Sequence, residues 1–344
     1  MKETKKIHKN NFFKKTFIKL CRLLGYEIID QSNFYVPTQK KSLGENLSIA
    51  GKKSITIPLG EINISRKVVG LTVIFRSCTS VNMLTQSKKR LFDENKSEYT
   101  LRSLYSILKA LKICKNNFPD INLNIIIIDH NSEKNDLDKM KILLKKFNFK
   151  NSIISLNVNE FINKINKTNS KNNLVTNNQL SNMSNIYKSL MLAKNDCEDL
   201  IYFVEDDYIH QKESINEMLF TYEKIASLIK KDLILCPIDY PYLYSKTDIT
   251  NIFLGDSRHW RVIEETLCTF LTSKKMVVDY WEKFTSMCEF EHYPFELPLH
   301  EIYKKEYCLS PIPSLAMHCT NINSTYGISP NMDWKELWEE NADY

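Results

Sequence analysis

Glycine is scarce in this chain of 344 residues, which has only seven, and none belongs to a Gly-rich phosphate loop. Neither GxGxxG nor GxxxxGK[ST] occurs, so the usual loops that hold a nucleotide's phosphates are excluded. No apolar run approaches the roughly 18 residues of a membrane span, and the start lacks the small-residue cleavage site of a secretory signal. We therefore expect a cytoplasmic protein.

Paired cysteines and a basic folded body are also missing. The nine cysteines are odd in number and form no CxxC pair, which argues against a disulfide framework or a zinc knuckle and fits a reducing compartment. The net charge is +6, but eight of the 47 basic residues and one of the 41 acidic residues lie within positions 1–24. The rest holds 39 basic and 40 acidic residues, so a nucleic-acid partner is not expected.

The basic N-terminal segment, residues 11–28, reads NFFKKTFIKLCRLLGYEI and predicts an amphipathic helix. Its apolar residues recur at helical spacing, with lysine and arginine on the other faces: Phe13, Phe17, Leu20 and Leu24. Such a helix either lies in an anionic membrane interface or packs its apolar stripe on the protein's own body. We keep both alternatives.

A regular pattern of buried strands and helices begins at residue 69. Apolar runs predict strands at 71–75, 123–128, 151–156 and 200–204, and helical spacing predicts helices at 98–115, 136–147 and 183–194. This alternation predicts an α/β fold with a mostly parallel sheet and helices on both faces. We expect a lead-in at 1–68, the main domain at 69–322, and a tail at 323–344 whose short helix docks over the domain or its site.

Three consecutive carboxylates follow the last of these strands in the stretch LIYFVEDDYIH, residues 200–210. Glu205, Asp206 and Asp207 form either a solvated acidic turn or a ligand site, since clustered like charges need a cation, a proton or water. Ligands bind at the carboxyl ends of strands in open α/β sheets. Because Gly-rich loops are missing, a divalent metal on these carboxylates is the natural way to hold a diphosphate.

The order of LTVIF, IDHNS and VEDDY over residues 69–320 resembles glycosyltransferases of the GT-A fold. The resemblance implies a GT-A-like, Rossmann-related sheet and a Mn²⁺ or Mg²⁺ ion on the diphosphate of a nucleotide sugar. It implies that Asp129 contacts the nucleotide base and that Asp207 binds the metal, with Glu205 beside it. Asp206 is then expected on the sugar or ribose side. The first residue of the motif, Glu205, departs from the common pattern.

The resemblance also assigns residues further along the chain. His318 in PSLAMHC matches a C-terminal histidine that returns to the metal, although a packed histidine is the plain alternative. Inverting members carry a catalytic base near a helix start, which points to Glu301 first and Glu296 second. Both are also ordinary charges at the start of a helix.

Two arginines are candidates for contact with the donor. Arg76 directly follows the first predicted strand, and Arg258 lies in the polar stretch GDSRHWR, residues 255–261. A solvated loop with one buried tryptophan is the alternative for that stretch.

These features predict a metal-dependent glycosyltransferase, inverting in outcome. It would move a sugar from a UDP-sugar to a glycan or lipid-linked acceptor in cell-surface polysaccharide biosynthesis, peripherally bound to the inner face of the membrane. One alternative is a metal-dependent nucleotidyltransferase on a similar sheet. The other is a non-catalytic protein that binds glycans or a membrane surface.

Overall fold

The computed structural model describes residues 12–26, 54–57, 60–80, 91–245, 249–320 and 324–344. They belong to two compact units, each considered by itself: a small one with α1 (Phe12–Leu23), and a large one that includes residues 62–344. A two-stranded sheet is formed by β1 (Ser54–Ile57) and β2 (Gly60–Asn63). None of the described helices is both long enough and apolar enough to cross a lipid bilayer. The segments 69–322 and 323–344, expected as separate parts, lie together in the large unit.

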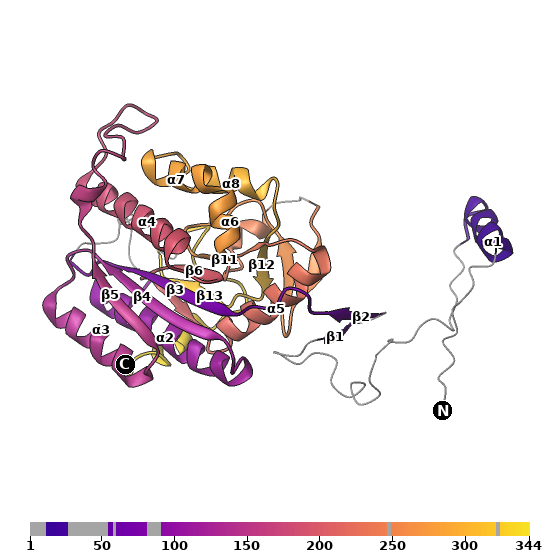
Figure 1. Ribbon diagram of the computed structural model, residues 1–344, viewed down its shortest axis with the longest axis horizontal. Coiled ribbons are helices and arrows are strands. Elements are labelled where there is room, and N and C mark those ends of the chain that lie inside the picture. The colour runs from indigo at the N-terminus through magenta and orange to yellow at the C-terminus, as the bar shows by residue number, and fades with distance from the viewer. Residues whose placement is uncertain (1–11, 27–53, 58–59, 81–90, 246–248, 321–323) are drawn as a thin grey trace. The chain divides into compact units, whose positions relative to one another are not determined.

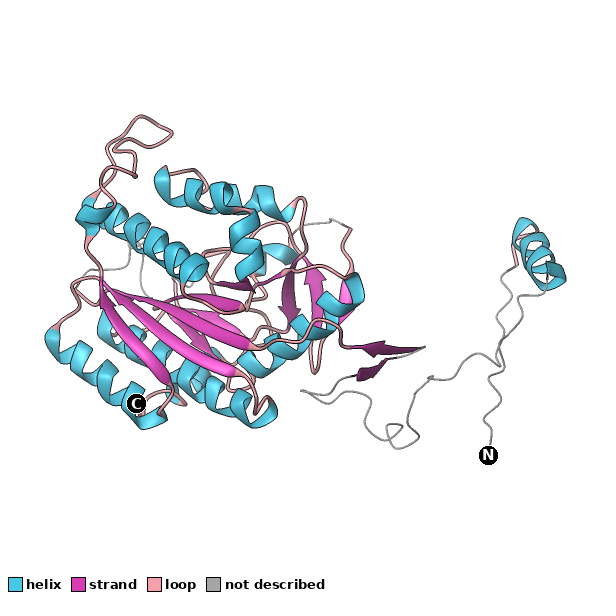
Figure 2. Cartoon of the chain, in the orientation of Figure 1, coloured by secondary structure: helices cyan, strands magenta, loops and turns pink. Residues whose placement is uncertain are grey.

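The large unit is built on a sheet of nine strands within the described residues (Figure 2). Seven strands run in one direction, and only β11 and β10 run against them. This confirms the predicted class, an α/β fold with a mostly parallel sheet. In order across the sheet, the strands are β5 (Lys150–Ser155), β4 (Asn122–Asp129), β3 (Gly70–Ser77), β6 (Leu200–Glu205), β11 (Phe270–Ser273), β8 (Ile234–Leu235), β12 (Cys308–Ile312), β10 (His259–Val262) and β9 (Ile252–Leu254).

Helices cover both faces of the sheet, which buries the apolar runs of its central strands (Figure 1). Neighbouring helices on one face are α2 (Lys96–Asn117), α3 (Lys134–Phe147) and α5 (Ser214–Ile229). On the other face lie α4 (Asn177–Asn195), α6 (Lys274–Asp279), α7 (Trp281–Glu289) and α8 (Leu297–Tyr303). Two short 3-10 helices, η3 (Val158–Glu160) and η4 (Pro241–Tyr244), lie in connections.

The predicted helices are present; two begin two residues early, at Lys96 and Lys134, and the third begins six residues early. The helix expected from residue 183 is α4, which starts at Asn177. The hydroxyl of Thr176 accepts a hydrogen bond from the backbone N–H of Gln179 at 3.2 Å, and this cap satisfies one free donor of the first turn. The polar first turn has no apolar periodicity, so the sequence pattern alone misses it.

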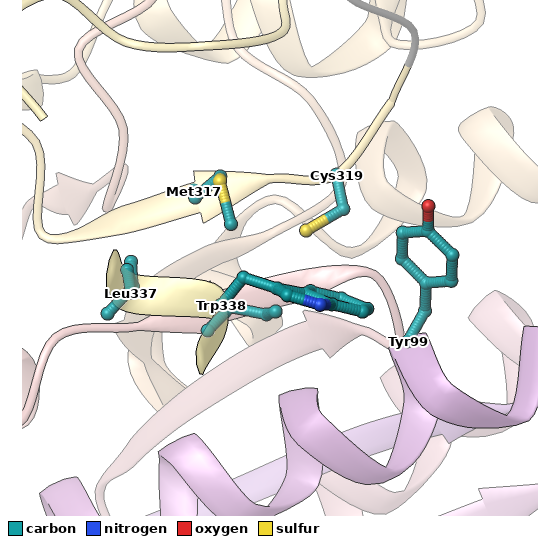
Figure 3. Packing of buried hydrophobic residues seen from close by; sticks show 6 residues of the cluster. Tyr99, Met317, Cys319, Leu337 and Trp338 are labelled. Atoms are coloured by element: carbon teal, nitrogen blue, oxygen red, sulfur yellow. The ribbon is translucent and has the colours of Figure 1, made fainter. Parts of the chain in front are cut away.

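A small antiparallel sheet follows the three carboxylates in the chain. It pairs β7 (Tyr208–His210) with β13 (Ala316–His318), and Tyr208 lies opposite His318. Figure 3 shows that the tail packs against this pair through α9 (Trp334–Glu339). The buried cluster contains Tyr99, Ile209, Met317, Cys319, Leu337 and Trp338. The chain's last helix therefore supports the element that follows the carboxylates.

Candidate active site

Polar residues of three neighbouring parallel strands meet at the carboxyl edge of the sheet. In the strand register, Arg76 of β3 lies opposite Glu205 of β6, and Ser77 lies opposite Asp129 of β4. Asp206 and Asp207 continue from β6 at the same edge. The sequence predicted that these residues follow strands of a parallel sheet, and the carboxyl ends of parallel strands lie at the same edge.

Each of the three consecutive carboxylates has its own cationic partner. Arg76 Nη2 lies 2.9 Å from Glu205 Oε1, and Lys96 of α2 pairs with Asp206. His318 Nε2 lies 3.5 Å from Asp207 Oδ2. These partners come from β3, α2 and β13, and all six side chains are largely shielded from solvent. The compensating charges explain how a buried strand can end in three acids.

Asp207 and His318 are brought together by the pairing of β7 with β13. The backbone N–H of Cys319 donates to the carbonyl of Asp207 at 2.8 Å, and the ring of Tyr208 stacks on that of His318 at 4.5 Å. Burial opposes ionisation of Asp207, but the charge and hydrogen bond of His318 outweigh it and lower the pKa of Asp207 to about 2. Burial also opposes the charged form of His318 and so lowers its pKa, but the negative charge of Asp207 outweighs this and the pKa of His318 is raised.

The orientation of His318 suits a metal ligand. Its Nδ1 lies 2.8 Å from the carbonyl of Tyr326. A carbonyl only accepts, so Nδ1 carries a proton and Nε2 is left to face Asp207, and metal-bound histidines show the same second hydrogen bond. One carboxylate and one imidazole form a nitrogen–oxygen donor set. Within the described ranges, no group of three or more His, Cys, Asp or Glu side chains is arranged to hold a metal ion.

Asp129 and Arg76 are held by neighbours at the same edge. Asp129 is 4% exposed, and its carboxylate accepts from the Ser77 hydroxyl at 2.7 Å and from the Ser132 N–H at 3.1 Å. Arg76 Nη1 donates to Asn182 Oδ1 of α4 at 3.0 Å. Nothing in the sequence pattern selected Asn182, because its helix turn lies outside the predicted helix.

The two candidate bases have very different surroundings. The Glu301 side chain on α8 is 42% exposed, and a 2.6 Å hydrogen bond from Lys304 lowers its pKa. Glu296 precedes α8, is partly buried, and has Cys268 Sγ at 3.8 Å from its Oε1. Burial and then the charge of Glu205 raise the pKa of Glu296 to about 7. Glu296 therefore belongs electrostatically with the three carboxylates.

Arg258 lies in the turn between β9 and β10. Its Nη2 donates to Gln211 Oε1 at 2.9 Å. The same turn is fixed by Glu217 of α5, which accepts hydrogen bonds from Ser257 N at 2.7 Å and from Trp260 Nε1 at 3.0 Å. Trp260 is fully buried. The stretch 255–261 is thus anchored on α5, and Arg258 contacts the residue that follows β7.

No protein-family model matches this chain, and no curated protein matches it in sequence. Solved structures are similar at low identity. A UDP-glucose pyrophosphorylase complexed with UDP-glucose is 7% identical with a TM-score of 0.40, over 80% of this chain and 97% of that one. Galactosyltransferase LgtC in complex with donor and acceptor sugar analogues is 11% identical with a TM-score of 0.35, over 79% and 95%.

Mouse xyloside xylosyltransferase 1 is 12% identical with a TM-score of 0.33, over 69% of this chain and 76% of that one. Glycosyltransferases are thus among the structures to which this chain is similar. Similarities of this size support no conclusion about function. The proposed function therefore rests on the chemistry of the site.

The raised pKa of Glu296 predicts a pH-dependent cost in stability. Its folded pKa of about 7 exceeds the ordinary 4.5, so the folded state binds more protons between these values and loses stability as pH rises through them. Glu296→Gln removes this loss, so its Tm relative to wild type should be clearly higher at pH 8 than at pH 5. Thermal unfolding at both pH values measures it, with the exposed Glu301→Gln as control. An equal difference at the two pH values would contradict the assignment.

Proposed function

We propose that this protein is a metal-dependent glycosyltransferase that uses a nucleotide-sugar donor, most simply a UDP-sugar. The observation that carries the proposal is the 3.5 Å approach of His318 to Asp207 at the carboxyl edge of the sheet. A carboxylate and an imidazole, drawn from distant parts of the chain, form a pair of donor atoms where an open α/β sheet binds its ligand. The acceptor would be a glycan or a lipid-linked sugar of cell-surface polysaccharide biosynthesis.

Asp207 and His318 would hold the metal, with Glu205 next to them. Mn²⁺ fits better than Mg²⁺, because Mg²⁺ prefers oxygen ligands throughout and this pair includes an imidazole nitrogen. Such an ion, held by these two residues, would supply Lewis-acid stabilisation of the diphosphate leaving group. Binding also requires His318 Nε2 to give up its proton, so metal affinity should weaken in acid.

Arg76 would contact the phosphates of the nucleotide-sugar donor at the same edge of the sheet. Its guanidinium lies between Glu205 and Asn182, and an arginine in this position is suited to phosphate oxygens. Asp129 is the neighbouring carboxylate, oriented by hydrogen bonds from Ser77 and Ser132, and it would contact the nucleotide base. Arg258, tied to Gln211, is a more distant candidate for phosphate or acceptor.

Glu296 would act as the general base toward the acceptor hydroxyl, in an inverting transfer. A base works best when its pKa lies near the operating pH, and the pKa of Glu296 is about 7. Glu301 is already paired with Lys304 at the surface. We therefore assign the base to Glu296 and keep Glu301 as the comparison.

The N-terminal helix would hold the enzyme on the inner face of an anionic membrane. Its apolar stripe is exposed, from 54% at Leu20 to 77% at Phe13, and Lys19 and Arg22 are exposed as well. Each basic side chain near an anionic surface contributes about 1 kcal/mol, and the buried stripe adds to this. Such a location brings a transferase to a lipid-linked acceptor.

The metal assignment predicts that Asp207→Asn abolishes Mn²⁺-dependent binding of UDP in isothermal titration calorimetry. The amide is a poor ligand for the ion, and His318 loses its charged partner. Asp138→Asn, on the exposed surface of α3, is the matched control and should bind like wild type. Unchanged affinity in Asp207→Asn would overturn the site. In turnover assays, release of pyrophosphate instead of UDP would identify a nucleotidyltransferase.

The base assignment predicts that Glu296→Gln lowers kcat by about a hundredfold or more, while UDP binding changes little. Glu301→Gln should keep near-normal turnover, since its side chain points to solvent and Lys304. Steady-state release of UDP from UDP-sugars measures both variants. A large loss in Glu301→Gln with none in Glu296→Gln would reverse the assignment.

The membrane proposal predicts that the full chain sediments with vesicles containing phosphatidylserine and that high salt weakens this association. Removal of residues 1–24 should abolish sedimentation but preserve Mn²⁺-dependent UDP binding. Phe17→Asp, which charges the exposed stripe, should act in the same direction. Equal sedimentation of the full and shortened chains would show that the segment is no anchor.

A further inference from the structure

The middle carboxylate of the acid triplet is fully occupied inside the protein. Asp206 is 9% exposed, and its Oδ1 pairs with Lys96, which is also 9% exposed. Its Oδ2 accepts two hydrogen bonds, from the Thr100 hydroxyl at 3.0 Å and from the backbone N–H of Cys78 at 3.1 Å. Both oxygens of this carboxylate thus bind donors of the protein itself, and little of the residue is accessible to a ribose.

The partners of Asp206 come from two other elements. Lys96 and Thr100 form one face of the first turn of α2, and Cys78 directly follows β3. The start of a 22-residue helix also favours a carboxylate through its unpaired N–H groups and dipole. Asp206 therefore joins the end of β6 to the end of β3 and to the start of α2.

This anchor controls where the next residue lies. Asp206 and Asp207 form the turn between β6 and β7, so fixing the Asp206 side chain also fixes the backbone from which Asp207 reaches His318. Outer groups that orient a metal ligand usually matter nearly as much as the ligand itself. The charges on Asp206 and Asp207 raise the pKa of Lys96 against the opposing effect of burial, so this lysine remains a cation in the folded protein.

We infer that Lys96 and Asp206 form a buried anchor that positions the metal-binding side of the acid turn, and that Asp206 is not a donor ligand. The triplet then divides into one anchor, Asp206, and two carboxylates that face other partners, Glu205 toward Arg76 and Asp207 toward His318. This differs from the role expected for Asp206 from family resemblance. The existence of the anchor does not depend on the proposed function. Its effect on metal binding does rest on the proposed function.

A double-mutant cycle tests the anchor on the full chain with Lys96→Met, Asp206→Asn and their combination. Each single change leaves a buried charge or polar group without its partner, so each should lower Tm by about 5–10 °C. The double variant leaves neither charge unpaired, so its Tm should exceed that of both singles. Additive losses would overturn the anchor, whatever the protein's activity.

The positioning role is tested by calorimetric titration of Mn²⁺ and UDP at 10 °C, where the variants are folded. Each single variant should bind about tenfold more weakly, and the double variant should recover to within about threefold of wild type although it lacks the Asp206 carboxylate. Lys224→Met is the control. This buried lysine donates to the Gly255 carbonyl at 3.1 Å, so its loss should lower Tm but not affinity.

Three results would overturn the positioning role: normal binding in the single variants, no recovery in the double variant, or an equal loss in Lys224→Met. If wild type itself does not bind Mn²⁺ and UDP, then the proposed function and the positioning role both fail. The Tm cycle still decides whether the buried anchor exists.

Discussion

Three adjacent negative charges at the end of a buried strand are the constraint on which this structure depends. Each carboxylate would be costly to bury alone, and each has a separate cation from another part of the chain: Arg76, Lys96 or His318. Those cations lie on β3, α2 and β13, so the acid turn is stable only when these elements are assembled around it. The charge requirement thereby ties together segments that are far apart in sequence.

The same arrangement separates the acidity of nearby carboxyl groups. Burial opposes ionisation of Asp207, but His318 outweighs it and lowers the pKa of Asp207 to about 2. Burial and the charge of Glu205 raise the pKa of Glu296 to about 7. Two groups of the same chemical type thus differ in protonation under neutral conditions. Enzymes use such differences to assign one carboxylate to charge binding and another to proton transfer. The difference in pKa is consistent with a permanently charged Asp207 and a Glu296 that exchanges its proton near neutral pH.

Much of the fold could be predicted from the sequence, because apolar runs and helical spacing survive into the structure as β3, β4, β5, β6, α2, α3 and α4. The meeting of Arg76, Asp129 and Glu205 also follows from strand direction. The roles assigned to these residues stay predictions. What the sequence could not show depends on tertiary packing. A lysine at a helix start is usually solvated, so nothing distinguished Lys96, and spacing alone could not tell that Glu296 faces inward while Glu301 faces water.

The packing of the tail has a consequence for how the protein is made. Trp338 stacks on Phe92 with ring centroids 3.9 Å apart, and its carbonyl accepts a hydrogen bond from Arg102 at 2.8 Å. These contacts support β7 and β13, which flank Asp207 and carry His318. Because α9 follows β13 in sequence, a chain still on the ribosome can form the parallel half of the sheet before this support is made. A nascent chain that has reached His318 but not Trp338 would therefore carry both residues of the candidate metal pair without the packing that supports them.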